Sequence, residues 1–155
     1  MNYEAIKEQE RLLRFDRFTY DTGIEIGLKI LNEAKREGQN LAVDVSICGH
    51  QIFHASLEGT TADNDEWLRK KKNTVYRFYQ SSFAIQLKLK EEGKRLEDAF
   101  ALSSADFTDA GGGFPIKVKG IGIIGAIVLT GTTQEDEHIR ITSCLSDYLG
   151  ILDCP

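Results

Sequence analysis

The segment from Ile121 to Thr130 constrains the fold of this chain most, because it is apolar at both alternating positions of a strand. A strand with one wet face alternates apolar and polar residues, whereas a strand buried on both faces does not. We therefore expect a central strand with a packed layer on each side. Gly122 and Gly125 inside this segment would let a neighbouring element approach closely.

Other local patterns place the remaining elements around that strand. Residues 41–47 and 52–57 alternate on either side of Cys48-Gly49-His50, which predicts a hairpin, and residues 114–119 predict one more strand. Apolar spacing and capping signals predict helices over residues 4–14, 18–37, 61–92 and 133–149, with a weaker one at 96–102. This order predicts an α/β (α+β) fold, an antiparallel sheet with helices packed on it, in a single domain spanning residues 1–155.

Composition excludes several classes of protein. The 155 residues carry 19 basic and 24 acidic side chains, a net charge of -5, which argues against a nucleic-acid-binding protein. No apolar run approaches the roughly 20 residues of a membrane helix. The polar N-terminus does not resemble a signal peptide. Three scattered cysteines without a tight Cys/His cluster indicate free thiols in a reducing cytoplasm and no metal site. We expect a cytoplasmic protein that binds neither nucleic acid nor membrane.

The beginning of the helix predicted over 61–92 carries several candidate ligand-binding residues. Asp63 and Asn64 are helix-capping types, and Trp67 either seals the first turn against the sheet, floors a pocket or anchors an interface. Lys71 follows on the inward stripe, where its ammonium needs a carboxylate, an anionic ligand or a water-filled gap, unless its tip reaches solvent. That stripe comprises Trp67, Lys71, Val75, Phe78, Ser82, Ile85 and Leu89.

Three histidines are the only imidazoles of the chain. His138 lies on the inward stripe of the last helix. It could act as an acid, a base or a haem-iron ligand, or it could be a packed core histidine. His50 and His54 belong to the hairpin, without a second ligand pattern that would make either a haem ligand. Their role stays open.

A glycine loop precedes the strand that begins at Phe114. Gly112 and Gly113 could present backbone N–H groups to an anion, or simply form a turn into the strand. The spacing of the later glycines from Gly120 to Gly125 matches a dinucleotide-binding pattern. It begins a strand rather than a helix, so it does not indicate such a site.

Several motifs together resemble one protein family. They are Gly59-Thr60-Thr61-Ala62-Asp63-Asn64-Asp65-Glu66-Trp67, Asn73-x-Val75, Ser81-Ser82-Phe83, Gly112-Gly113-Phe114-Pro115-Ile116, and Gly122-x-x-Gly125 followed by Gly131. From about residue 12 to residue 149 the chain is similar to the haem-degrading-domain (GlcG/HbpS-like) proteins, and most similar to the UPF-type bacterial and fungal branch. The resemblance implies an α/β/α sandwich around a profilin-like sheet. It also implies a homo-oligomer, a dimer or a larger ring, and haem or corrinoid-related binding in some members.

These observations lead to one leading hypothesis and two alternatives. The first is a cytoplasmic oligomeric protein that binds a small anionic molecule, with haem or another tetrapyrrole as the ligand that the resemblance implies. The alternatives are a structural or adaptor oligomer without catalytic activity, and an enzyme, for which we identify no catalytic residue. The candidate ligand-binding residues are Asp63, Asn64, Trp67, Lys71, Gly112, Gly113, Phe114 and His138.

Overall fold

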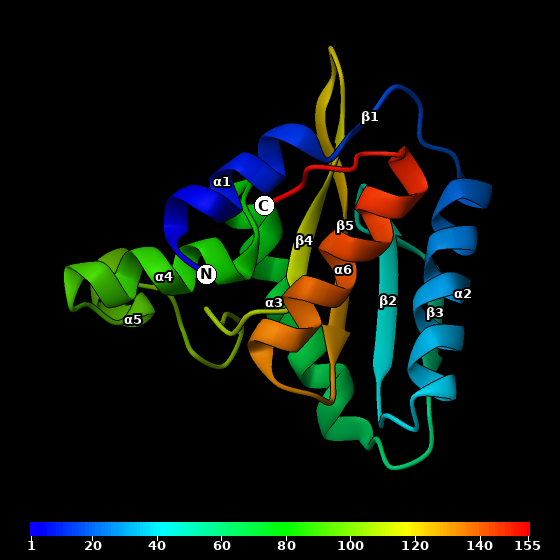
Figure 1. Cartoon of the computed structure of the whole chain (residues 1–155). Coiled ribbons are helices and arrows are strands. Elements are labelled where there is room, and N and C mark those ends of the chain that lie inside the picture. The colour runs from blue at the N-terminus through cyan, green and yellow to red at the C-terminus, as the bar shows by residue number, and fades with distance from the viewer.

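A five-stranded sheet forms the centre of the computed structural model, which describes residues 1–155 (Figure 1). The spatial order of the strands is β1-β4-β5-β2-β3. β1 runs parallel to β4, and every other pair of neighbours is antiparallel. The strands are β1 (Arg14–Phe15), β2 (Ala42–Ile47), β3 (His50–Ser56), β4 (Gly113–Val118) and β5 (Gly122–Thr130).

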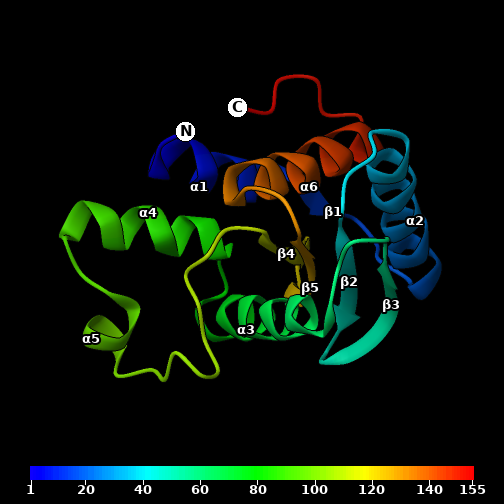
Figure 2. The same cartoon turned by 90° about the horizontal axis from the view of Figure 1, so that it is seen from below.

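Helices cover both faces of the sheet. Figure 2 shows α2 and α6 on one face and α3 on the other, so the predicted α/β/α sandwich is confirmed. The helices are α1 (Tyr3–Leu12), α2 (Tyr20–Arg36), α3 (Ala62–Phe78), α4 (Ser82–Glu92), α5 (Leu96–Phe100) and α6 (Gln134–Leu149). None of them is both long and apolar enough to cross a bilayer.

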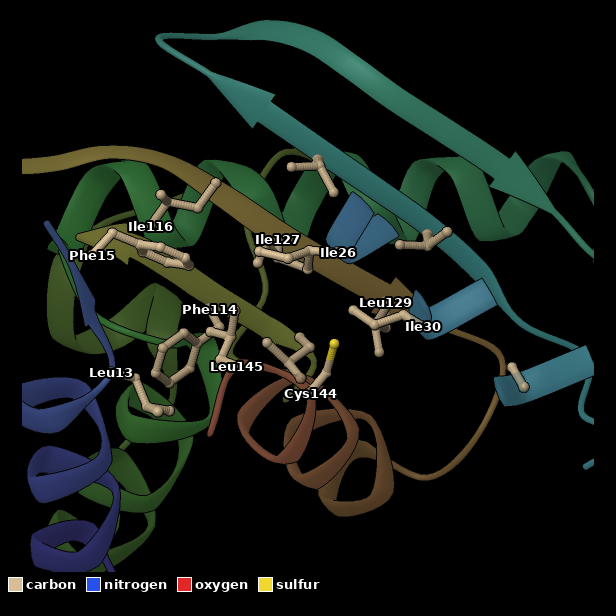
Figure 3. Close-up of a cluster of buried hydrophobic side chains, with 14 of the residues drawn as sticks. Leu13, Phe15, Ile26, Ile30, Phe114, Ile116, Ile127, Leu129, Cys144 and Leu145 are labelled. Carbon is tan, nitrogen blue, oxygen red and sulfur yellow. The ribbon is translucent and has the colours of Figure 1, made fainter. Parts of the chain in front are cut away.

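The central strand β5 contributes to a separate cluster of apolar side chains on each face. Ile127 and Leu129 belong to the larger cluster, which fills the space between the sheet, α2 and α6 (Figure 3). Ala126 and Val128 point the other way and pack with Leu68 under α3. The expectation of a strand buried on both faces is therefore confirmed.

The prediction of one helix over residues 61–92 is wrong, because the chain breaks between α3 and α4. Tyr79 adopts a left-handed conformation with φ 54° and ends α3. Ser81 then caps α4 by accepting a hydrogen bond from the N–H of Ala84. The Ser81 N–H donates to the buried Glu10 carboxylate of α1 at 2.7 Å. The backbone N–H of Ser81, which is buried at this break, is thus satisfied by a charge-assisted hydrogen bond to a distant helix.

The N-terminal segment also differs from its prediction. The helix expected over residues 4–14 begins at Tyr3 and ends at Leu12, and Arg14 belongs to β1 instead. A strand of two residues is too short to produce a recognisable alternation, which explains why the sequence does not predict it. It pairs with β4 and places the buried Phe15 in the larger cluster.

Gly131, which follows β5, lies where the end of the sheet is tightly packed. It has φ 126°, and a Cβ at this position would overlap the carbonyl oxygen of Asn40. Gly120 also has a positive φ, 75°, but a Cβ there would meet nothing within 4 Å. We expect Gly131→Ala to lower the free energy of unfolding by about 3 kcal/mol, and Gly120→Ala by about 1 kcal/mol, because only the first adds a clash to the backbone strain. Urea denaturation measures both, and equal losses would contradict the clash.

Candidate ligand-binding site

A cleft of about 490 Å³ opens where the first turns of α3 and α6 meet the end of β5. Residues 108–110, which precede β4, complete its wall. Most of the lining is polar. The lining residues are Asp63, Asn64, Trp67, Lys71, Thr108, Asp109, Ala110, Thr130, Gly131, Thr132, Gln134 and Glu137.

Local capping explains why both helices begin at the cleft. At α3, the Thr61 N–H donates to the Asn64 side-chain oxygen at 2.8 Å, one half of a capping box. At α6, Thr133 Oγ1 accepts from the Asp136 N–H, as the sequence predicts. Because a helix N-terminus carries partial positive charge, both ends contribute a field that favours electron-rich groups in the cleft.

A buried ion pair lies along the cleft wall. Lys71 Nζ and Glu137 Oε2 are 2.5 Å apart, and their side chains are only 4% and 2% exposed. Lys71 also donates to the Leu129 carbonyl oxygen at 2.8 Å, and Glu137 Oε1 accepts from the Thr132 N–H at 3.1 Å. An ammonium has three N–H donors, and the third N–H of Lys71 has no acceptor in the protein.

Burial acts on both partners of this pair in opposite senses. Loss of water lowers the pKa of Lys71, an effect that the neighbouring Glu137 charge opposes. Loss of water likewise raises the pKa of Glu137, again against the attraction of its partner. Both shifts bring the pKa values of the two groups closer together than those of a solvent-exposed lysine and glutamate.

The glycine loop lies directly against the ion pair. Gly112 has φ 106°, and a Cβ there would overlap Glu137 Oε2 and come within 2.9 Å of Lys71 Nζ. Its function in the structure is therefore to leave room for the two charged groups. Gly113 donates its N–H to Ser82 Oγ at 2.9 Å, and Phe114 is fully buried. These two residues lie behind the cleft and do not line it.

Asp63, Asn64 and Trp67 lie at the rim of the cleft. Trp67 is 40% exposed, so the prediction that it faces inward with the rest of its stripe is wrong. Its indole N–H donates to Asp63 Oδ2 at 3.2 Å, and Lys70 Nζ lies 5.4 Å from its ring centroid. The indole is thus held at the mouth of the cleft and stays partly exposed.

His138 is separate from the cleft. Its Nε2 lies 2.7 Å from Gln9 Oε1, and its ring packs against Phe83 and Phe114 at centroid distances of 5.1 and 5.7 Å. Nδ1 is buried without a partner, and burial lowers the pKa of His138 to about 4. This geometry matches the alternative of a neutral core histidine.

The other two histidines lie on opposite faces of the edge strand β3. The His50 ring lies 5.8 Å from that of Tyr20 in α2, whereas His54 Nε2 is 3.5 Å from Asp65 in α3. Because α2 and α3 cover different faces, these two imidazoles do not converge on one site.

Sequence reasoning missed Glu137 because it predicted an inward stripe of α6 that includes His138, Ile141, Leu145 and Tyr148 and does not include Glu137. The buried face of α6 is in fact wide enough to include both Glu137 and His138. Its buried residues are Glu137, His138, Ile141, Thr142, Cys144 and Leu145. A carboxylate three to four residues before Ile141 is the signal that could have identified Glu137.

Comparisons with known proteins agree with the resemblance in the sequence. The family model described as haem degrading protein HbpS-like matches residues 18–145. A UPF0303 protein of Rhizobium johnstonii is 44% identical over 133 residues, which cover 86% of this chain and 82% of that protein. A UPF0303 protein of Sinorhizobium medicae is 38% identical over 142 residues, covering 92% and 87% respectively.

Solved structures share the fold. The crystal structure of the Ybr137w protein superimposes with a TM-score of 0.90 at 27% identity, covering 97% of this chain and 88% of that one. The crystal structure of a PduOC:heme complex superimposes with a TM-score of 0.70 at 14% identity, covering 83% and 93%. At that identity the second likeness concerns the fold alone.

Removal of one member of the ion pair tests its contribution to stability. We expect Lys71→Met to lower the free energy of unfolding by roughly 3–5 kcal/mol, because it leaves the Glu137 carboxylate buried without a counter-charge. The double variant Lys71→Met/Glu137→Met should recover most of that loss, since it removes both charges. Urea denaturation of the three proteins gives the comparison, and a double variant no more stable than the single one would contradict this explanation.

Proposed function

Because this chain belongs to the HbpS-like haem-degrading family, we propose that it is an oligomeric small-molecule-binding protein whose ligand occupies the cleft above the Lys71–Glu137 pair. The observation that carries the proposal is the third N–H of Lys71, a donor without a protein acceptor on a side chain that lines the cleft. A buried ammonium donor of this kind is stabilised when an oxygen atom accepts its hydrogen bond.

The lining of the cleft limits the chemistry of that ligand. Lys71 is already matched by Glu137, and the carboxylates of Asp63 and Asp109 add negative charge to the wall. A ligand with many negative charges would therefore be repelled. A small molecule with a single carbonyl or carboxylate oxygen fits Lys71 and the two helix N-termini, with the exposed indole of Trp67 as a lid for its apolar part.

Haem is the ligand that the family description suggests, and the cleft does not fit it. A haem pocket is largely apolar and provides a side-chain ligand to iron. Trp67 and Ala110 are the only apolar residues of this lining, and no histidine belongs to it. The unpartnered Nδ1 of His138 is enclosed between Phe83 and Phe114 and cannot reach an iron atom in the cleft.

Acetate, which carries one carboxylate, is a suitable probe for the proposed site. Trp67 is the only tryptophan of the chain and lies at the rim, so its fluorescence reports occupancy of the cleft. We expect acetate to change that fluorescence saturably at constant ionic strength, with chloride as the reference anion. The change should be absent in Lys71→Met/Glu137→Met and retained in Lys119→Met, which alters an exposed lysine outside the cleft. A response that is identical in all three proteins would refute binding at Lys71.

Titration with haemin separates a haem site in the cleft from one elsewhere. Because the cleft offers iron no imidazole, we expect any shift of the Soret band to be the same in the unaltered protein and in Lys71→Met/Glu137→Met. A shift that disappears in the double variant would instead place haem over the ion pair and contradict the geometric argument.

A further inference from the structure

We propose that Lys71 forms a covalent imine with a small aldehyde or ketone held in the cleft, and that Glu137 carries the protons of this reaction. The inference rests on the proposed function, since it uses the same cleft. It adds an activity to the binding site and narrows the ligand to carbonyl compounds.

The hydrogen bonds around Lys71 Nζ leave one of its positions without a protein partner. Two of its tetrahedral positions are occupied by the Leu129 carbonyl oxygen at 2.8 Å and Glu137 Oε2 at 2.5 Å. Gly112, which has no Cβ, lies against the pair from the side of the β4 loop. Lys71 lines the cleft, and the one unassigned direction at nitrogen is where an electrophilic carbon would approach.

Imine formation at Lys71 conserves protons and charge when Glu137 accepts one proton and later returns it. Lys71 passes a proton to Glu137 and becomes a neutral amine, and rotation about the Cε–Nζ bond turns its lone pair from Glu137 toward the cleft. The lone pair then attacks the carbonyl carbon and opens the C=O π bond onto oxygen. After a proton moves from nitrogen to that oxygen, the carbinolamine hydroxyl receives the Glu137 proton and leaves as water. The C=N bond that forms carries the remaining positive charge, so the sum is ammonium plus carbonyl giving iminium plus water.

The net charge of the buried site also favours imine formation over loss of a proton to the ligand. A buried ion pair resists any change of its net charge, because an isolated charge at this depth costs several kcal/mol. Donating a proton to a ligand and losing it would leave the site with an unbalanced carboxylate. Imine formation avoids this cost, since an iminium ion next to the Glu137 carboxylate replaces an ammonium ion next to the same carboxylate. The chemistry therefore suits a lysine that cannot lose its counter-ion.

The helix itself provides a matched control. Lys72, the next residue of α3, also forms an ion pair, with Asp44 Oδ1 at 2.9 Å, but it does not line the cleft. Its side chain is 19% exposed, against 4% for Lys71. Exposure alone would thus make Lys72 the more reactive of the two.

The test uses propanal as the carbonyl probe and sodium cyanoborohydride to reduce any imine to a stable secondary amine. The folded, unaltered protein is treated at neutral pH, and peptide mapping with fragment spectra assigns the propyl groups to Lys70, Lys71 and Lys72. We expect propylation of Lys71 to be at least about tenfold faster than that of Lys72, because only Lys71 has a neighbouring acid–base group together with access to the cleft. Lys71→Arg, which keeps the positive charge, should lose that product while its neighbours react as before.

A rate at Lys71 equal to or below that at Lys72 would overturn the imine. Acetate cannot form an imine, so a fluorescence response to acetate without trapping at Lys71 would leave the proposed binding function intact and remove only the covalent step. If acetate does not change the fluorescence of the unaltered protein, the proposed binding function is refuted, whatever the trapping experiment shows.

Discussion

The ion pair between Lys71 and Glu137 connects the two helical layers of the molecule. α3 and α6 cover opposite faces of the sheet (Figure 2). Their side chains meet near the end of β5, where the Leu129 carbonyl also accepts from Lys71. Apolar packing holds each helix to its own face, and this charged contact connects the third turn of α3 to the first turn of α6. Both residues line the cleft, so this contact is part of its wall.

Backbone groups and glycines at the end of β5 surround the Lys71–Glu137 pair. Where β5 ends, the Leu129 N–H donates to the Gly112 carbonyl at 2.7 Å, and the Thr132 N–H turns toward Glu137. Gly112 and Gly131 are among the glycines at which a Cβ would overlap a neighbouring group. The motif that resembles a glycine-rich anion loop therefore provides space for side chains rather than N–H groups for a ligand.

Local patterns predicted the elements, whereas distant partners determined the site. The central strand, the cap at Thr133 and the hairpin around Cys48-Gly49-His50 each follow from neighbouring residues, and all three agree with the structure. The break after Tyr79 depends instead on Glu10 of α1, which is 71 positions away from Ser81. Glu137 is 66 positions from Lys71, so the need of that ammonium for a carboxylate could be predicted, but not which carboxylate meets it.

The three consecutive lysines of α3 have a consequence for how this helix is oriented. Lys70 lies over the Trp67 ring, Lys71 reaches α6, and Lys72 reaches Asp44 inside the sheet. Successive residues of a helix are about 100° apart around its axis, so each ammonium has a different direction and a different partner. A rotation of the helix by one residue would separate Lys71 and Lys72 from their partners, whereas Lys70 and Trp67 belong to the same helix and would turn together. The rotation of α3 about its own axis is therefore specified by two ion pairs on different sides of the helix as well as by the apolar contacts of Leu68 and Val75.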